Sequence, residues 1–296
     1  MYKTTHGANI KKINNKYVCY VIHNAGFFSN CTSCLVNLIE SIEHFKDTNI
    51  ELNTSNTFKL YKNLQKNGDI GLEYFKKADK SIKLDIIFEK GTKVESGMSL
   101  LPYKTLLFDK FAPYIKKYFS VSIQVTNIIS IMEKKYKIDY DNTCCVFFRG
   151  LDKFVETGIP EYDIFCNKAK EVTKNDKSIT FLLQSDETEF FDYAKNIFEN
   201  NLIFNEEIRH MKHSKTILEN SLNKNENFKY SLYFLAIVII MSRCKYVICN
   251  TSNVSLWIAL YRGNANNLYQ YLRQIPKFHN VCVNPLYDSS VKDVWY

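Results

Sequence analysis

Three stretches of the chain share one pattern, in which an apolar run ends in polar residues. They are Cys144–Lys153 (CCVFFRGLDK), Ile179–Asp186 (ITFLLQSD) and Tyr246–Gly263 (YVICNTSNVSLWIALYRG). Short apolar runs bounded by polar residues are typical of strands buried in a parallel sheet. Open α/β sheets bind ligands at the carboxyl ends of their strands. The three stretches therefore predict one crevice, and Arg149 and Lys153 indicate that its contents are anionic.

Strands alternate with helices throughout the second half of the chain. We expect strands at Cys144–Arg149, Ile179–Gln184 and Tyr246–Asn250, and helices at Tyr162–Thr173, Glu187–Asn200, about 228–243 and Val254–Arg262. This alternation is typical of a parallel, right-handed α/β sheet.

The first half opens in the same way. A strand at Tyr17–His23 runs into the loop Asn24–Asn30 and then into a helix with one apolar face. Further elements are expected as a strand at Asp85–Glu89 and helices at Tyr103–Phe119 and Val121–Tyr136. The polar segment 139–142 predicts a boundary between a domain at 1–142 and a second at 143–275. The tail, 276–296, is expected to pack back on the first domain.

Composition narrows the class of protein. The 296 residues carry a formal charge of +8 and no block of like charges, so we expect no nucleic-acid arm. The N-terminus lacks the apolar segment of a signal peptide. The longest apolar run, Leu232–Met241, has about ten residues, whereas a membrane span needs roughly 17 to 25. These features predict a soluble, cytoplasmic protein without a transmembrane segment.

The nine cysteines lie mostly inside apolar runs, which predicts reduced thiols in the core. Cys31 and Cys34 form a CxxC after a strand, and a redox protein is one alternative for the chain. His210 and His213 form an HxxH in a basic, polar setting, which favours a surface segment over a metal site.

Arg149 ends its strand, and its planar guanidinium suits bidentate binding of a phosphate. A salt bridge to Asp152 is the structural alternative, and Gly150 allows the backbone to turn sharply. Asp186 and Glu189 are spaced as a capping box for the next helix, which does not prevent Asp186 from contacting a ligand. Ser185 could bond a base or ribose.

The turn Asn250-Thr251-Ser252-Asn253 precedes a helix with an apolar stripe. Helix N-termini present N–H groups and partial positive charge, which makes them sites for anions. Four consecutive hydrogen-bonding residues exceed what one N-cap needs, although an ordinary serine/threonine turn remains an alternative.

Together the three stretches resemble the nucleotide-sugar-binding half of the inverting fucosyltransferases, which include α1,6-, α1,2-, nodulation-factor and protein O-fucosyltransferases. The first family motif, His-x-Arg-Arg-(Thr/Gly)-Asp, is similar to Phe147–Asp152 here. Strand ends near Ser/Thr-Asp resemble Gln184–Asp186, and the third motif resembles Met241–Cys244 with Ile248–Ser252. The resemblance covers roughly residues 143–263 and is closer to viral and bacterial members than to the animal enzymes.

The resemblance implies an α/β, GT-B-like fold with two facing Rossmann-like domains and parallel sheets. It also implies transfer of fucose from GDP-fucose with inversion, without an obligatory metal, onto a glycan or other hydroxyl acceptor. Arg149 would hold the β-phosphate with Lys153, and Glu156 would be the general base, with Asp152 as the alternative base. The other residues expected at the nucleotide sugar are Ser185, Asp186, Asn250, Thr251, Ser252, Asn253, Ser255, Asn24 and Gly26.

Two positions depart from the family pattern. Phe147 stands where the family has histidine, and Gly150 stands where it has a second arginine. With one arginine instead of two to bind the diphosphate, the nucleotide sugar that serves as donor stays open. The alternative to an active transferase is therefore an inactive protein of the same fold that binds a nucleotide sugar or glycan. The acceptor cannot be read, because acceptor sites in this architecture belong to the variable first domain.

Overall fold

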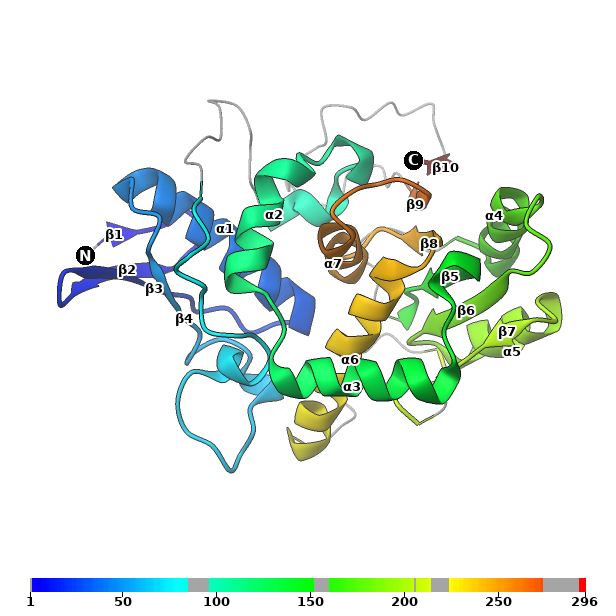
Figure 1. Ribbon diagram of the computed structural model, residues 1–296, viewed down its shortest axis with the longest axis horizontal. Helices are drawn as coiled ribbons and strands as arrows, with labels where there is room; N and C mark the ends of the chain where they lie inside the picture. Colours follow the sequence, from blue (N-terminus) through cyan, green and yellow to red (C-terminus); the bar gives the residue numbers. More distant parts are fainter. Residues whose placement is uncertain (1, 85–95, 152–159, 205, 214–223, 274–292) are drawn as a thin grey trace. The chain divides into compact units, whose positions relative to one another are not determined.

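The computed structural model describes residues 2–84, 96–151, 160–204, 206–213, 224–273 and 293–296 (Figure 1). The chain divides into two compact units. The first comprises Met1–Met98, Leu107–Ile128 and Leu222–Ala236, and the second comprises Ser99–Leu106, Ile129–Ser221 and Ile237–Tyr296. The chain first passes from the first unit to the second after Met98, which is earlier than the boundary predicted after residue 142. It returns to the first unit at Leu107 and again at Leu222.

The first unit contains a four-stranded sheet in the order β1-β2-β3-β4. Its strands are β1 (Tyr2–Lys3), β2 (Asn9–Ile13), β3 (Lys16–Tyr20) and β4 (Glu51–Asn53). Strands β1, β2 and β3 pair antiparallel, and β3 and β4 pair parallel. The parallel sheet expected in the first domain is therefore wrong for the described residues, where the sheet is mixed. Asn14 and Asn15 form the two-residue turn between β2 and β3, with φ of 47° and 61°. Asparagine tolerates this left-handed conformation, which two-residue hairpin loops require.

Helix α1 (Phe27–Phe45) follows β3 and supplies much of the core of this unit. Its side chains Phe27, Cys31, Leu35, Leu38 and Ile42 are fully or almost fully buried. The spacing of three and four residues places them on one face, as the apolar pattern predicted. The remaining helices are α2 (Phe108–Tyr118), the parts of α3 (Ile123–Tyr136) and α6 (Lys224–Arg243) that belong to this unit, and the short η1 (Lys59–Tyr61) and η2 (Ile70–Glu73). The strand predicted at Asp85–Glu89 lies outside the described residues.

The second unit contains a six-stranded sheet in the order β10-β9-β8-β5-β6-β7 (Figure 1). Its strands are β5 (Thr143–Phe148), β6 (Thr180–Ser185), β7 (Asn201–Leu202), β8 (Tyr246–Asn250), β9 (Leu268–Arg273) and β10 (Asp293–Trp295). Strands β5 to β9 are parallel, and every side chain of β5 is buried. A central parallel strand is covered on both faces, which explains its uninterrupted apolar sequence.

Helices α4 (Tyr162–Thr173), α5 (Thr188–Ile197) and α7 (Asn253–Arg262) complete the alternation in this unit. The rings of Phe148 on β5 and Phe190 on α5 stack with centroids 4.8 Å apart, and Phe165 on α4 meets Phe148 edge to face. This aromatic cluster packs α4 and α5 against the sheet. It thereby fixes the carboxyl ends of β5 and β6 next to each other.

The short connections η3 (Ser96–Leu100), η4 (Tyr103–Thr105) and η5 (Tyr140–Asn142) also occur in the described residues. The tail was expected to pack on the first domain. Residues 274–292 lie outside the described part, but β10 pairs antiparallel with β9, so the end of the tail joins the sheet of the second unit. Among the described residues, no helix is long and apolar enough to cross a membrane.

Candidate functional site

The carboxyl ends of β5 and β8 are joined by one side chain. Asn250 accepts a hydrogen bond from the main-chain N–H of Arg149 at 2.8 Å and donates one to the carbonyl of Arg149 at 2.7 Å. Asn250 is only 2% exposed. The Asn250 side chain thus accepts from the N–H and donates to the carbonyl of Arg149, as the backbone of a neighbouring strand would. These two bonds hold the backbone in place where β5 ends. This role differs from the direct nucleotide contact that was expected of Asn250.

Asp186, at the end of β6, contacts the same loop. Its carboxylate forms an ion pair with the Arg149 guanidinium and accepts the main-chain N–H of Gly150 at 2.9 Å. The prediction that Asp186 and Glu189 form a capping box is wrong. Asp186 turns toward β5, the residue at the cap is Glu187, and Glu189 accepts the main-chain N–H of His213 instead. The structure therefore brings Arg149, Asp186 and Asn250 together at one edge of the sheet.

Gly150 lies against a buried carboxylate. A Cβ atom at Gly150 would lie 2.4 Å from Glu187 Oε2 and 2.7 Å from its Cδ. Contacts of that length do not occur between real atoms, so any side chain at position 150 would displace Glu187. The space that a second arginine of the family motif would enter is occupied by this carboxylate.

The turn after β8 faces inward. The N–H of Thr251 donates to the carbonyl of Tyr271 at 3.1 Å, and that of Ser252 donates to the Tyr103 hydroxyl at 3.2 Å. Thr251 and Ser252 are each 1% exposed. Both amides are therefore engaged inside the unit, and binding of a nucleotide by this turn stays a prediction.

A segment before α2 holds this turn in place. The Tyr103 hydroxyl donates to the carbonyl of Ser252 at 2.9 Å, and burial raises the pKa of Tyr103 well above its usual value. Gln270 accepts from the main-chain N–H of Tyr103 at 2.8 Å and donates to the Thr251 hydroxyl at 2.9 Å. Nothing in the sequence pattern indicated Tyr103 or Gln270, because both act through partners far along the chain.

The serines predicted at the nucleotide also have local partners. Ser185 accepts the N–H of Glu187 at 3.0 Å, and the fully buried Ser255 donates to the carbonyl of Asn250 at 2.6 Å. Ser252 is the N-cap of α7 and accepts the N–H of Ser255 at 3.1 Å. These bonds support the turn that carries Asn250, while Asn253 begins α7 as a half-buried residue.

Asn24 and Gly26 belong to the loop before α1 in the first unit. The Asn24 side chain donates to the carbonyl of Asn56 at 2.8 Å and accepts the N–H of Lys59 at 3.0 Å, so it joins two loops of this unit. A Cβ atom at Gly26 would meet nothing within 4 Å. Neither the conformation nor the surroundings of Gly26 therefore require glycine. The predicted residues Asp152, Lys153 and Glu156 lie outside the described residues.

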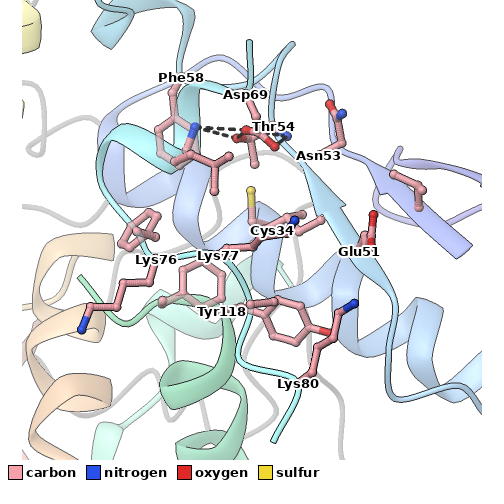
Figure 2. A pocket seen from close by; sticks show the side chains of 17 residues that line it. Cys34, Glu51, Asn53, Thr54, Phe58, Asp69, Lys76, Lys77, Lys80 and Tyr118 are labelled. Atoms are coloured by element: carbon pink, nitrogen blue, oxygen red, sulfur yellow. Dashed lines mark hydrogen bonds between the residues drawn. The ribbon is translucent and has the colours of Figure 1, made fainter. Parts of the chain in front are cut away.

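A pocket of about 220 Å³ occurs within the first unit (Figure 2). Buried Cys34, Phe58 and Phe119 are among the apolar residues that line it. Asp69 lies at one side, where its carboxylate accepts the N–H groups of Thr54 and Gly71. Figure 2 also shows the side chains of lining residues Lys76 and Lys80 extending on opposite sides. The pocket thus combines an apolar interior with charged groups at its margin.

The CxxC of α1 is buried. Cys31 and Cys34 are free thiols with no exposed surface, and burial raises the pKa of each well above its usual value. A thiol held in its protonated form is a poor nucleophile, so this finding weighs against the redox alternative. All eight cysteines that the structure describes are free and buried, which confirms the prediction for those residues. Within the same part of the chain, no group of three or more potential ligands could hold a metal ion.

Comparison with solved structures identifies the fold. One match is the crystal structure of NodZ α1,6-fucosyltransferase co-crystallised with GDP, with a TM-score of 0.51 at 10% identity over 86% of this chain and 94% of that chain. The structure of fucosyltransferase NodZ from Bradyrhizobium gives a TM-score of 0.48 at 9% identity over the same shares. The sequence matches no known family profile and no curated protein. The first match confirms the expected GT-B-like α/β fold.

Proposed function

We propose that this chain is an inverting glycosyltransferase that moves a sugar, fucose from GDP-fucose, onto a hydroxyl group of a glycan or similar acceptor. The observation that carries the proposal is the position of Arg149. It stands where the central strand β5 ends, its backbone is fixed by Asn250, and its guanidinium is held by Asp186. Ligands of open α/β sheets bind at this edge. The shared fold with a fucosyltransferase crystallised with GDP supports the same assignment.

In this reaction a general base takes the proton of the acceptor hydroxyl, and the oxygen attacks the anomeric carbon from the face opposite the diphosphate. The bond from that carbon to the phosphate oxygen breaks, and the nucleoside diphosphate leaves with the electron pair. Arg149 stabilises the charge that develops on this leaving group. Asp186 keeps the guanidinium oriented before the donor binds. Glu156 remains the proposed base, Lys153 a second cation and Asp152 the alternative base. No step assigned to these residues requires a metal.

We assign the acceptor to the first unit. Its pocket is large enough for part of a sugar ring and offers both apolar surface and charged groups. Sites for small ligands commonly combine these two kinds of lining.

The test is binding of GDP and GDP-fucose by calorimetry, with UDP and UDP-glucose for comparison. A ligand at a hundred times its Kd stabilises the fold by about 2.7 kcal/mol, so a thermal shift gives a second readout. Arg149→Gln should weaken binding by about ten- to a hundredfold, because a hydrogen bond to a charged group is worth about 1.5–3 kcal/mol. Arg243→Gln is the matched control, since Arg243 pairs with Glu133 at a half-exposed position. No binding of any nucleotide would contradict the proposal.

The second candidate is an inactive protein that binds a nucleotide sugar or glycan. The pairing of Arg149 with Asp186 and the occupation of the space beside Gly150 favour it, because both reduce the positive charge offered to a diphosphate. Measurement of donor hydrolysis and of sugar transfer separates the two. Binding without turnover supports the inactive protein, and turnover that Glu156→Gln abolishes supports the transferase and its base.

A further inference from the structure

The pocket of the first unit has an interior suited to an aromatic group. Its lining includes the rings of Phe58, Phe75, Tyr118 and Phe119. Aromatic rings pack favourably against other rings in offset or edge-to-face arrangements. A dry cavity of about 150 Å³ in another protein binds benzene. This pocket, at about 220 Å³, therefore has room for an aryl group larger than benzene.

The buried polar groups of the lining have partners inside the protein. The Tyr118 hydroxyl donates to the carbonyl of Ile50 at 2.8 Å. The Thr54 hydroxyl donates to the Asp69 carboxylate and accepts the N–H of Gly71 at 2.8 Å. Sugar hydroxyl groups placed beside them would lose their water without gaining new partners, which is costly. The interior therefore favours an apolar part of a ligand over its hydroxyl groups.

The margin of the pocket carries three exposed lysines, Lys76, Lys77 and Lys80. In the part of the chain that the structure describes, none of the three forms an ion pair with a carboxylate. The two carboxylates of the lining are already engaged, because Glu51 pairs with Lys16 at 3.4 Å and Asp69 accepts main-chain N–H groups. Lys76 and Lys80 extend on opposite sides, so a cation is available from more than one direction (Figure 2).

The positive charge of the whole chain is concentrated in the same unit. By its bounds, the first unit holds 19 of the 39 lysines and arginines and 12 of the 31 aspartates and glutamates, which makes +7 of the formal charge of +8. All of its basic residues are lysines. Lysines are hydrated point charges that suit general attraction of anions more than bidentate binding. A field of one sign raises the local concentration of ligands of the opposite sign.

We propose that this pocket binds an aryl group joined to an anionic group, and that the acceptor of the sugar is accordingly an acidic aromatic molecule with a free hydroxyl group. The aryl group fills the interior, and a carboxylate, sulfate or phosphate lies at the margin within reach of a lysine. The claim rests on the proposed function, because it takes the pocket as the site of the acceptor. It adds a class of substrate that the position of Arg149 does not specify.

The experiment compares three small probes by calorimetry. The first, 2-naphthalenesulfonate, has both the ring and the anion, 2-naphthalenesulfonamide has the ring without the charge, and methanesulfonate has the anion without the ring. The sulfonate should bind about fivefold more tightly than the sulfonamide, because one exposed ion pair accounts for a change of up to about that size. Methanesulfonate should not bind measurably. About 1 M NaCl should bring the two aryl probes to similar affinities, since salt screens exposed charges.

Variants of single lysines identify the cation. At least one of Lys76→Gln, Lys77→Gln and Lys80→Gln should weaken binding of the sulfonate by about two- to fivefold and leave that of the sulfonamide unchanged. Lys3→Gln is the matched control, because Lys3 is an exposed lysine of the same unit that does not line the pocket.

Two further variants locate the bound probe. Leu72 lines the pocket and Leu64 does not, although both side chains are equally exposed. Leu72→Trp should therefore weaken binding of both aryl probes, and Leu64→Trp should weaken neither. Thermal denaturation of each variant shows whether its fold is intact.

The outcomes separate the two proposals. Equal affinity for the sulfonate and the sulfonamide, no binding of either, or binding that Leu72→Trp leaves unchanged would each show that the proposed class of ligand is wrong. None of these measurements involves a nucleotide, so the proposed function would still stand on the binding of GDP-fucose. If the sulfonate binds in the pocket as expected and no nucleotide binds, the pocket keeps its class of ligand while the transferase proposal falls.

Discussion

The side-chain amide of Asn250 forms two hydrogen bonds with the backbone of Arg149, 2.8 Å from its N–H and 2.7 Å from its carbonyl. A terminal residue of β8 thus determines where the proposed phosphate-binding arginine stands. Asn250→Ala should lower the free energy of unfolding by about 1–3 kcal/mol, because it removes two hydrogen bonds that are each worth about 0.5–1.5 kcal/mol. Urea denaturation measures this loss. Asn250→Asp keeps the acceptor for the N–H but places a buried carboxylate against the Arg149 carbonyl, so it should destabilise the protein at least as much as alanine. Equal stability of all three proteins would contradict the assigned role.

Gly150→Ala should destabilise the protein by about 1–3 kcal/mol, the usual cost of overpacking. The reason is the Cβ contact of 2.4 Å with Glu187 Oε2. Thermal denaturation checks the effect, with Gly26→Ala as the control, since a Cβ there would meet nothing within 4 Å. A Gly150→Ala protein as stable as Gly26→Ala would show that Glu187 moves aside freely.

Tyr103→Phe removes only a hydroxyl group. That group bonds both the N–H and the carbonyl of Ser252 in a fully buried setting. The Ser252 carbonyl also accepts the N–H of Leu256 at 2.9 Å, so the loss leaves only the buried Ser252 N–H without its partner. The free energy of unfolding should fall by about 1–3 kcal/mol. Hydrogen exchange at the Ser252 amide should accelerate in the variant, which distinguishes this cause from a general loosening. An unchanged exchange rate would rule the hydrogen bond out as the cause.

Leu72→Trp tests the pocket of the first unit. Leu72 lines the pocket and is 54% exposed, so a larger side chain can enter the space without disturbing the core. Sugar transfer to an acceptor should fall several-fold, while GDP-fucose binding stays unchanged. Leu64→Trp is the control, because Leu64 has the same 54% exposure but does not line the pocket. If Leu72→Trp weakened GDP-fucose binding and Leu64→Trp did not, the pocket would bind the donor and the acceptor assignment would be wrong.

Cys31 and Cys34 should resist thiol reagents in the native protein. Burial raises the pKa of both thiols, so neither forms a thiolate at neutral pH, and neither has exposed surface. Mass spectrometry after treatment with iodoacetamide should find both unmodified until the protein is unfolded by urea. Rapid native modification of either residue would revive the redox alternative.

Much of the second unit could be predicted from the sequence. The predicted helix Tyr162–Thr173 has the same bounds as α4, and the strand Tyr246–Asn250 coincides with β8. Buried strands and amphipathic helices carry their pattern in consecutive residues, which explains this success. By contrast, β2 (NIKKI) was missed, since most of its side chains are exposed and no apolar alternation marks it.

The site was predictable only in part. Arg149 and Asp186 were expected at one crevice, and the structure brings them together. The inward turn of Thr251 and Ser252 could not be foreseen, because Tyr103 and Tyr271, which bind their amides, come from other segments. Glu187, which lies against Gly150, was missed for the same reason, since its partners Tyr162 and His213 come from other segments. An acidic residue before a helix looks like an ordinary cap until tertiary structure supplies its partner.

In the part of the chain that the structure describes, the larger sheet ends in a short strand on each side. β7 has two residues and β10 has three, and β10 runs against the direction of its neighbour. An edge strand of two or three residues exposes few unpaired backbone N–H and C=O groups to a strand of another chain. The aggregation that long, flat sheet margins invite is therefore disfavoured, and the apolar strands between them stay protected from intermolecular pairing.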